Sequence, residues 1–323
     1  MEYKKREAKE FAREKMKGLW IAIPTPFDKS GEIDETGLRT NLTYYRDKLK
    51  VAGIFCNGNV GEFWALTVQE RKRSVEIIVE EVGKDVCIIA HTAHHCLKDA
   101  VELTRHAQDV GAHFAIAVNP YIAGKNDAAV YRYYQELCRQ VDIGIGLFNA
   151  PYVGYSMTPD LIARLADIDN VCVVKDTDTL DHVTEVRRRV KDKIIVSDPT
   201  EERWLMNILH FKQPVLLADP DPYMLQKPAK LTIKEYTELA LAGEIEKATE
   251  LYASLYPVRR VYDKWFIHPL IRGEMPMASL KYWTELLGMV GGKVRPPLNE
   301  ISETQKAELE KDLRQVGLIG GKK

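Results

Sequence analysis

The sequence predicts an α/β fold, a (β/α)8 or TIM barrel followed by a C-terminal helical domain. Eight short apolar runs alternate with amphipathic helical segments, a pattern typical of a parallel sheet covered by helices. No Gly-x-Gly-x-x-Gly motif follows the first run, which disfavours an open dinucleotide-binding sheet. Beyond Asp221 the strand-like runs stop, and only helical periodicity continues.

The predicted strands are apolar runs bounded by polar residues, as expected where both faces of a parallel strand are buried. In chain order they are Leu19–Ile23, Ala52–Cys56, Val86–Ala90, Phe114–Val118, Ile143–Phe148, Val171–Lys175, Ile194–Ser197 and Val215–Ala218. The helices between them carry start and stop signals: a capping box opens at Thr67, proline follows the N-cap Thr158, and Gly111 marks a C-terminus. These helices are Asp34–Leu49, Thr67–Val82, Leu97–Val110, Asp127–Arg139, Pro159–Ala166, Leu180–Val190 and Glu201–Leu209.

Helical periodicity also marks both ends of the chain. The first 17 residues alternate charged side chains around a thin apolar stripe, so we expect a short leading helix on the outside of the barrel. Downstream, the pattern appears at Ile233–Ala242, Glu244–Tyr256 and Leu280–Met289. We therefore expect a helical extension at 1–17, the barrel at 18–225 and a helical domain at 226–323.

Composition narrows the class of protein. A chain of 323 residues with 45% hydrophobic residues can bury a large core. A net charge of −1 with interspersed signs gives no support for a nucleic-acid surface. The sequence contains no run of 18 or more apolar residues, so we expect no membrane span. The N-terminus lacks the apolar region of a signal peptide. Five cysteines without paired spacing predict reduced residues in a cytoplasmic protein.

Lys175 ends the apolar run that begins at Val171, and polar residues follow at once. A lysine at the carboxyl end of a buried strand is partly desolvated, which disfavours its charged form and frees the amine to attack a carbonyl carbon. From this run alone, a lysine that snorkels into water is the commoner case. Because barrel active sites lie at the carboxyl ends of the strands, the other strand ends decide the question.

The loop Gly58-Asn59-Val60-Gly61 follows the second strand. Two glycines three apart let the backbone turn so that N–H groups converge into a nest that binds an anion. A carboxylate held there, close to Lys175, would present its 2-oxo group to the amine. A tight strand-to-helix turn explains the same residues, so the loop alone is weak evidence.

Taken together, motifs at five strand ends resemble the dihydrodipicolinate synthase / N-acetylneuraminate lyase family over roughly residues 18–290. The motifs are Pro24-Thr25-Pro26-Phe27, Gly58 to Thr67, Asn119-Pro120-Tyr121, Phe148-Asn149-Ala150-Pro151 and Val174-Lys175-Asp176. The resemblance implies a class I aldolase-type enzyme, usually a homotetramer built as a dimer of dimers, with no cofactor and no metal. It implies that Lys175 forms a Schiff base with a 2-oxo acid, whose carboxylate the Gly58–Gly61 loop holds. It also places Tyr121 and Ala218 at the substrate.

Several positions depart from the family's usual pattern. Asn59 and Val60 replace hydroxyl residues, and Phe148 replaces the tyrosine that relays protons. Val153 stands where synthases of lysine biosynthesis carry an arginine for the aldehyde's carboxylate, and Ile122 replaces a tyrosine that reaches a neighbouring subunit's site. Because a buried charge without a partner is costly, these changes favour a less polar substrate, including an aromatic one.

Without this tyrosine, the usual proton relay is either absent or moved to another group. Tyr152 and Tyr155 lie just downstream, and either hydroxyl could fold back. His91, His94 and His95 crowd the strand-three loop, and the pKa of histidine suits proton transfer near neutrality. The alternatives for these histidines are surface residues without a catalytic role, or a metal site, which would need a further ligand.

We therefore expect a Schiff-base-forming lyase (an aldolase, hydratase-aldolase or dehydratase) that acts on a 2-oxo acid such as pyruvate or a pyruvate adduct. The expected catalytic residues are Lys175, His94, His95 and Tyr152, and the expected substrate contacts are Gly58, Asn59, Val60, Phe148, Tyr121 and Ala218. Two alternatives stay open: 4-hydroxy-tetrahydrodipicolinate synthase of lysine biosynthesis, and a non-catalytic relative that binds a 2-oxo acid.

Overall fold

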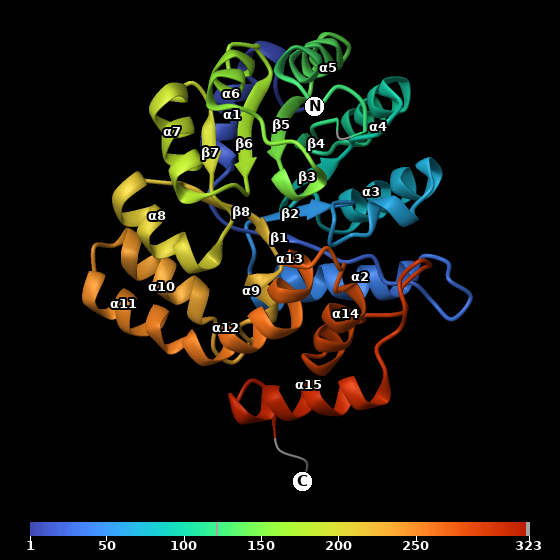
Figure 1. The fold of residues 1–323 in the computed structure, drawn as a ribbon, viewed down its shortest axis with the longest axis vertical. Helices are drawn as coiled ribbons and strands as arrows, with labels where there is room; N and C mark the ends of the chain where they lie inside the picture. Colours follow the sequence, from blue (N-terminus) through green and yellow to red (C-terminus); the bar gives the residue numbers. More distant parts are fainter. Residues whose placement is uncertain (121, 321–323) are drawn as a thin grey trace.

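Eight parallel strands form a nearly closed barrel surrounded by helices in the computed structural model of the chain, which describes residues 1–120 and 122–320 (Figure 1). The hydrogen-bonded order is β7-β6-β5-β4-β3-β2-β1-β8, so the (β/α)8 prediction is confirmed. The strands are β1 Gly18–Ala22, β2 Gly53–Cys56, β3 Cys87–His91, β4 Phe114–Val118, β5 Gly144–Asn149, β6 Val171–Asp176, β7 Ile195–Ser197 and β8 Val215–Asp219. Each lies within one residue of its predicted bounds.

Side chains close the seam between β7 and β8, the two ends of the ladder order. The Ser197 hydroxyl donates to the Val215 carbonyl at 3.0 Å and accepts from the Leu217 amide at 3.1 Å. The Gln213 amide also donates to the Val215 carbonyl, at 2.8 Å. These bonds satisfy buried backbone groups where the parallel ladder stops, and they hold the first half of β8 against the end of β7.

The helices around the barrel follow the predicted alternation. They are α2 Glu35–Tyr44, which continues as the π-helical turn η2 Tyr45–Leu49, then α3 Val68–Val82, α4 Leu97–Val110, α5 Asp127–Arg139, α6 Pro159–Leu165, α7 Leu180–Val190 and α8 Trp204–Phe211. Short 3-10 turns precede several of them: η3 Phe63–Ala65, η4 Pro151–Val153 and η5 Glu201–Arg203. The capping box at Thr67 and the N-cap at Thr158 form as expected, with side-chain bonds to the amides of Glu70 and Leu161.

The leading helix packs against the amino-terminal end of the barrel. It consists of η1 Lys5–Glu7 and α1 Ala8–Lys15, and Ala8, Ala12 and Met16 of its apolar stripe are buried. The Tyr3 hydroxyl donates to the His113 carbonyl at 2.6 Å and accepts from the Gly144 amide at 2.8 Å, where β4 and β5 begin. This segment therefore closes the end of the barrel opposite to the carboxyl ends of the strands.

The C-terminal helices lie to one side of the barrel (Figure 1, orange and red). They are α9 Asp221–Met224, α10 Thr232–Leu241, α11 Ile245–Ser254, α12 Tyr256–Tyr262, η6 Asp263–Ile267, α13 His268–Ile271, α14 Met277–Leu286 and α15 Glu303–Gln315. The sequence analysis did not delimit α12 to α13 or α15. Prolines in the first turns of α12 and α13 interrupt that stretch, although this is where a helix tolerates proline.

A buried ion pair ties these helices to the barrel. The Arg259 guanidinium on α12 donates to both carboxylate oxygens of Glu201 on η5, at 2.8 and 2.9 Å. The attachment brings Phe266, Leu270 and Met277 over the carboxyl ends of the strands. No helix in residues 1–120 and 122–320 is long and apolar enough to cross a bilayer.

Candidate active site

Lys175 lies at the end of β6, and its amine is buried inside the barrel. The residue is 4% exposed, and its Nζ donates to the carbonyl of Ala218 on β8. The rings of Phe148 and Phe55 lie 5.0 and 5.2 Å from Nζ. Burial lowers the pKa of Lys175, while Asp219 and Asp221 act in the opposite direction. Lys175 is therefore the desolvated lysine that the sequence predicted, and it does not snorkel into water.

A cavity of about 50 Å³ opens beside this amine. Four other predicted site residues line it with Lys175, namely Asn59, Val60, Phe148 and Tyr152. Since a single water needs about 10–15 Å³ on this scale, the cavity has room for a small acid. Ala218 takes part through its hydrogen bond to Lys175. Gly58 lies just outside, and a Cβ there would stand 2.5 Å from the Phe55 ring.

Asp219 is a cavity residue that the sequence analysis missed. It ends β8, and its Oδ1 lies 3.9 Å from the Lys175 Nζ. Burial raises its pKa to about 6, although the attraction of Lys175 lowers it. The signal in the sequence was a carboxylate at the carboxyl end of a barrel strand, directly after Ala218. The other unforeseen wall residues are Ala22, Phe55, Phe266, Leu270, Met275 and Met277.

The loop after β2 is held in a turn between two residues with left-handed backbone, Asn57 and Glu62. The Asn57 side chain donates to the Arg71 carbonyl at 2.9 Å and accepts from the Ser74 hydroxyl at 2.6 Å. Thr25 donates to the carbonyl of Gly61 at 2.9 Å. The loop is thus anchored on both sides while Asn59 and Val60 face the cavity.

Tyr152 is the tyrosine that reaches the cavity. Its hydroxyl accepts a hydrogen bond from the Asn59 side chain at 2.5 Å, and burial raises its pKa. The hydroxyl of Tyr155 donates instead to Asp127 on α5. Of the two tyrosines considered from the sequence, only Tyr152 therefore lies near Lys175.

His91 ends β3 and is buried among aromatic rings. Its Nδ1 lies 2.9 Å from the carbonyl of Asn57, which can only accept, so Nδ1 carries the proton. Burial lowers the pKa of His91 well below its usual value, as do the nearby charges of Arg71 and Lys175. The imidazole is therefore neutral, and its ring packs edge-on against Phe63 and Phe148.

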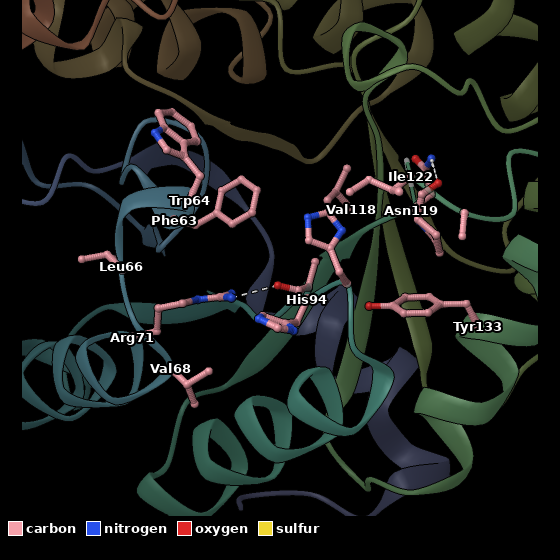
Figure 2. Close-up of a pocket in the computed structure, with 14 residues that line it drawn as sticks. Phe63, Trp64, Leu66, Val68, Arg71, His94, Val118, Asn119, Ile122 and Tyr133 are labelled. Carbon is pink, nitrogen blue, oxygen red and sulfur yellow. Dashed lines mark hydrogen bonds between the residues drawn. The ribbon is translucent and has the colours of Figure 1, made fainter. Parts of the chain in front are cut away.

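The structure does not bring His94 or His95 to Lys175. Both line a separate cavity of about 390 Å³, and Figure 2 shows His94 among Phe63, Tyr133 and other residues there. The His94 Nδ1 lies 3.1 Å from a carboxylate oxygen of Asp99. This placement gives no support to the catalytic role predicted for these two histidines. Tyr121, the other predicted contact, lies outside the described residues.

One group in the described part of the chain has the spacing of metal ligands: Asp176, Asp178 and His182. Both ring nitrogens of His182 face acceptors, with Nδ1 3.1 Å from Asp176 and Nε2 2.9 Å from the Met157 carbonyl. Burial lowers the pKa of His182, but these acceptors outweigh it and raise the pKa overall. With both ring nitrogens facing acceptors, His182 joins the cluster into a hydrogen-bonded network next to Lys175.

Known proteins resemble this chain over most of its length. Residues 15–211 match the family described as the dihydrodipicolinate synthetase family. The 4-hydroxy-tetrahydrodipicolinate synthase of Methanothrix thermoacetophila is 30% identical over 307 residues, which cover 94% of this chain and 98% of the relative. This chain belongs to the dihydrodipicolinate synthetase family.

Other members of the dihydrodipicolinate synthetase family match over nearly their whole length. The 4-hydroxy-tetrahydrodipicolinate synthase of Syntrophobacter fumaroxidans is 30% identical, covering 94% of this chain and 99% of the relative. A crystal structure of a dihydrodipicolinate synthase superposes with a TM-score of 0.81 at 29% identity, covering 94% of this chain and 100% of that chain. As a family member, this chain is a Schiff-base-forming lyase of the class I aldolase type that acts on a 2-oxo acid.

Proposed function

We infer that Lys175 forms the Schiff base, and that the substrate is pyruvate or a pyruvate adduct. The observation that carries this assignment is the buried amine with a lowered pKa at a cavity large enough for a small acid. The neutral amine adds to the C2 carbonyl and loses water to give an iminium. The iminium accepts electrons from a breaking C3–C4 bond or from a departing C3 proton.

The carboxylate of the acid lies at the loop Gly58–Gly61 in this proposal. Asn59 and Val60 line the cavity beside Lys175, and backbone N–H groups of a turn bind an anion without any side-chain hydroxyl. The left-handed Asn57 and Glu62 at the ends of the loop support its shape. Gly58 has to lack a side chain because the Phe55 ring occupies the space next to it.

The remaining walls favour an apolar group on the rest of the substrate. Phe266, Leu270 and Met277 from the C-terminal helices, and Met275 from the connection between α13 and α14, face the cavity. Lys175 is the only cation among the described residues that line it. A second carboxylate would be buried there without a partner, at a cost of several kcal/mol. A hydratase-aldolase or an aldolase of apolar 2-oxo acids fits these walls.

A second candidate is 4-hydroxy-tetrahydrodipicolinate synthase, the name carried by the curated relatives at 30% identity. A comparison of kcat/KM for aspartate semialdehyde and for an apolar aldehyde, each supplied with pyruvate, separates the synthase from the lyase of apolar substrates. We expect the apolar aldehyde to give the higher kcat/KM. A clear preference for aspartate semialdehyde would establish the synthase instead.

Borohydride trapping tests the imine and separates an enzyme from a non-catalytic binder. Incubation with pyruvate and borohydride should add one reduced pyruvyl group, and peptide mapping should place it on Lys175. Lys281 is a matched control because it is equally buried but ion-paired with Glu62 at 2.5 Å. Lys175→Ala should fold and lose both label and turnover. A wild-type protein that gains no mass with any 2-oxo acid would overturn the assignment.

The proposal extends to assembly and location. A homotetramer, a dimer of dimers, would cover the exposed Ile122 and Trp64, which line the cavity of about 390 Å³. All five cysteines are free, and three are buried, which fits a reducing compartment such as the cytoplasm.

A further inference from the structure

A carboxyl group lies next to the Lys175 amine, and both line the same cavity. Asp219 ends β8, and its Oδ1 lies 3.9 Å from the Lys175 Nζ. The residue directly before it, Ala218, accepts the hydrogen bond of that amine. The Asp219 side chain is 31% exposed, on the cavity side, so a bound molecule can reach it.

The distance between Asp219 and Lys175 suits a group that exchanges protons with the substrate atoms next to Nζ. When the amine has added to a 2-oxo acid, the new hydroxyl is attached to the carbon bonded to Nζ. Hydrogen bonds between hydroxyl and carboxyl oxygens span about 2.5–3.0 Å. An oxygen that is 3.9 Å from the nitrogen can therefore contact that hydroxyl without displacing the amine.

Three other side chains near Lys175 are less suited than Asp219 to move protons near neutral pH. Phe148 has no exchangeable proton. Burial raises the pKa of Tyr152 and lowers that of His91, so both stay neutral and resist a change of charge. Burial raises the pKa of Asp219 to about 6, close to the working pH that favours acid–base catalysis.

We propose that Asp219 is the general acid and base of this lyase, in the place of the tyrosine that Phe148 replaces. The assignment rests on the proposed Schiff-base function of Lys175. The protonated carboxyl gives its proton to the carbinolamine hydroxyl, the C–O bond breaks, water leaves, and the nitrogen lone pair forms the C=N bond. The resulting carboxylate then takes a proton from C3. The C–H electrons form the C2=C3 bond, and the C=N electrons return to nitrogen, which gives the enamine.

Exchange of the substrate's C3 protons with deuterium oxide measures these steps and needs no second substrate. The substrate is pyruvate, or whichever 2-oxo acid the protein traps. Loss of the methyl signal in proton NMR gives the rate. Asp219→Asn should lower the enzyme-catalysed rate by about 10²-fold or more, and Asp219→Glu should restore part of it. Lys175→Ala gives the background rate.

If Asp219 acted only through its charge, Asp219→Asn would raise the exchange rate instead of lowering it. The carboxylate of Asp219 raises the pKa of Lys175, so removing it leaves the amine more often neutral and more reactive. If Asp219→Asn exchanges as fast as the wild type or faster, the acid–base role is overturned and the imine function stands. The same holds if Tyr152→Phe causes a larger loss than Asp219→Asn. If the wild type traps no 2-oxo acid under borohydride, both assignments fall.

Discussion

At the scale of single residues, Asp219 should destabilise the fold at neutral pH. Burial raises its pKa to about 6, whereas an aspartate in an unfolded chain titrates near 3.9. Between these values the folded protein binds more protons than the unfolded chain, so the free energy of unfolding falls as pH rises through this window. Lys175, Asp198 and Asp221 supply the neighbouring charges.

Asp219→Asn removes this penalty. We expect the variant to match the wild type near pH 4 and to have a higher melting temperature at pH 7.5, measured by thermal unfolding. Asp28→Asn is a control of opposite sign, because the Ser30 hydroxyl lowers the pKa of Asp28 and its loss should cost stability above that pKa. An equal shift of Asp219→Asn at both pH values would show that its burial does not matter.

At the scale of elements, a buried ion pair connects the loop after β2 to α14. The Lys281 Nζ lies 2.5 Å from a carboxylate oxygen of Glu62, and both residues are at most 1% exposed. Burial raises the pKa of Glu62 and lowers that of Lys281, while each partner opposes the shift of the other. The C-terminal helices therefore help to hold the loop that we place at the substrate carboxylate.

Removing one member of this pair leaves the other charge buried without its ion-pair partner. Glu62→Gln should lower the free energy of unfolding by about 3–5 kcal/mol, measured by urea unfolding. It should also raise KM for the 2-oxo acid more than it lowers kcat, because the loop loses its support. In the exposed pair of Lys234 and Glu238, Glu238→Gln should cost less than about 1 kcal/mol. Equal costs at the two sites would contradict the argument.

At the scale of the whole molecule, exposed apolar side chains indicate self-association. Ile122 is 70% exposed and Trp64 is 36% exposed, and both line the larger cavity at the carboxyl end of the barrel. Covering large apolar side chains is favourable, and several together mark an interaction surface more reliably than one alone.

Light scattering should give a mass of roughly four times the 36.9 kDa chain. Ile122→Asp should shift the population to smaller species. Leu241→Asp is the matched control, since Leu241 is 67% exposed but lies on α10, away from that cavity. A single species at the chain mass for the wild type would count against the homotetramer.

Much of the fold follows from patterns within short windows of sequence. Apolar runs located the strands to within one residue, and the caps at Thr67 and Thr158 located helix starts, because hydrophobic periodicity and capping are local. A local apolar run also predicted Lys175 at the end of a strand. Local patterns did not delimit α12 to α13, because prolines in the first turns of these helices resemble helix-breaking signals.

The acid–base partner that we propose for the lysine depended on tertiary structure. His94 and His95 looked suitable by residue type, yet the fold turns them into another cavity. Asp219 is distant from Lys175 in the sequence, and only the closure of the barrel at β8 brings the two together. Its pKa follows from burial beside that amine, and burial depends on how the whole chain packs. The sequence by itself determined the barrel and the lysine at the end of its sixth strand, whereas packing alone decided that Asp219 lies beside that lysine.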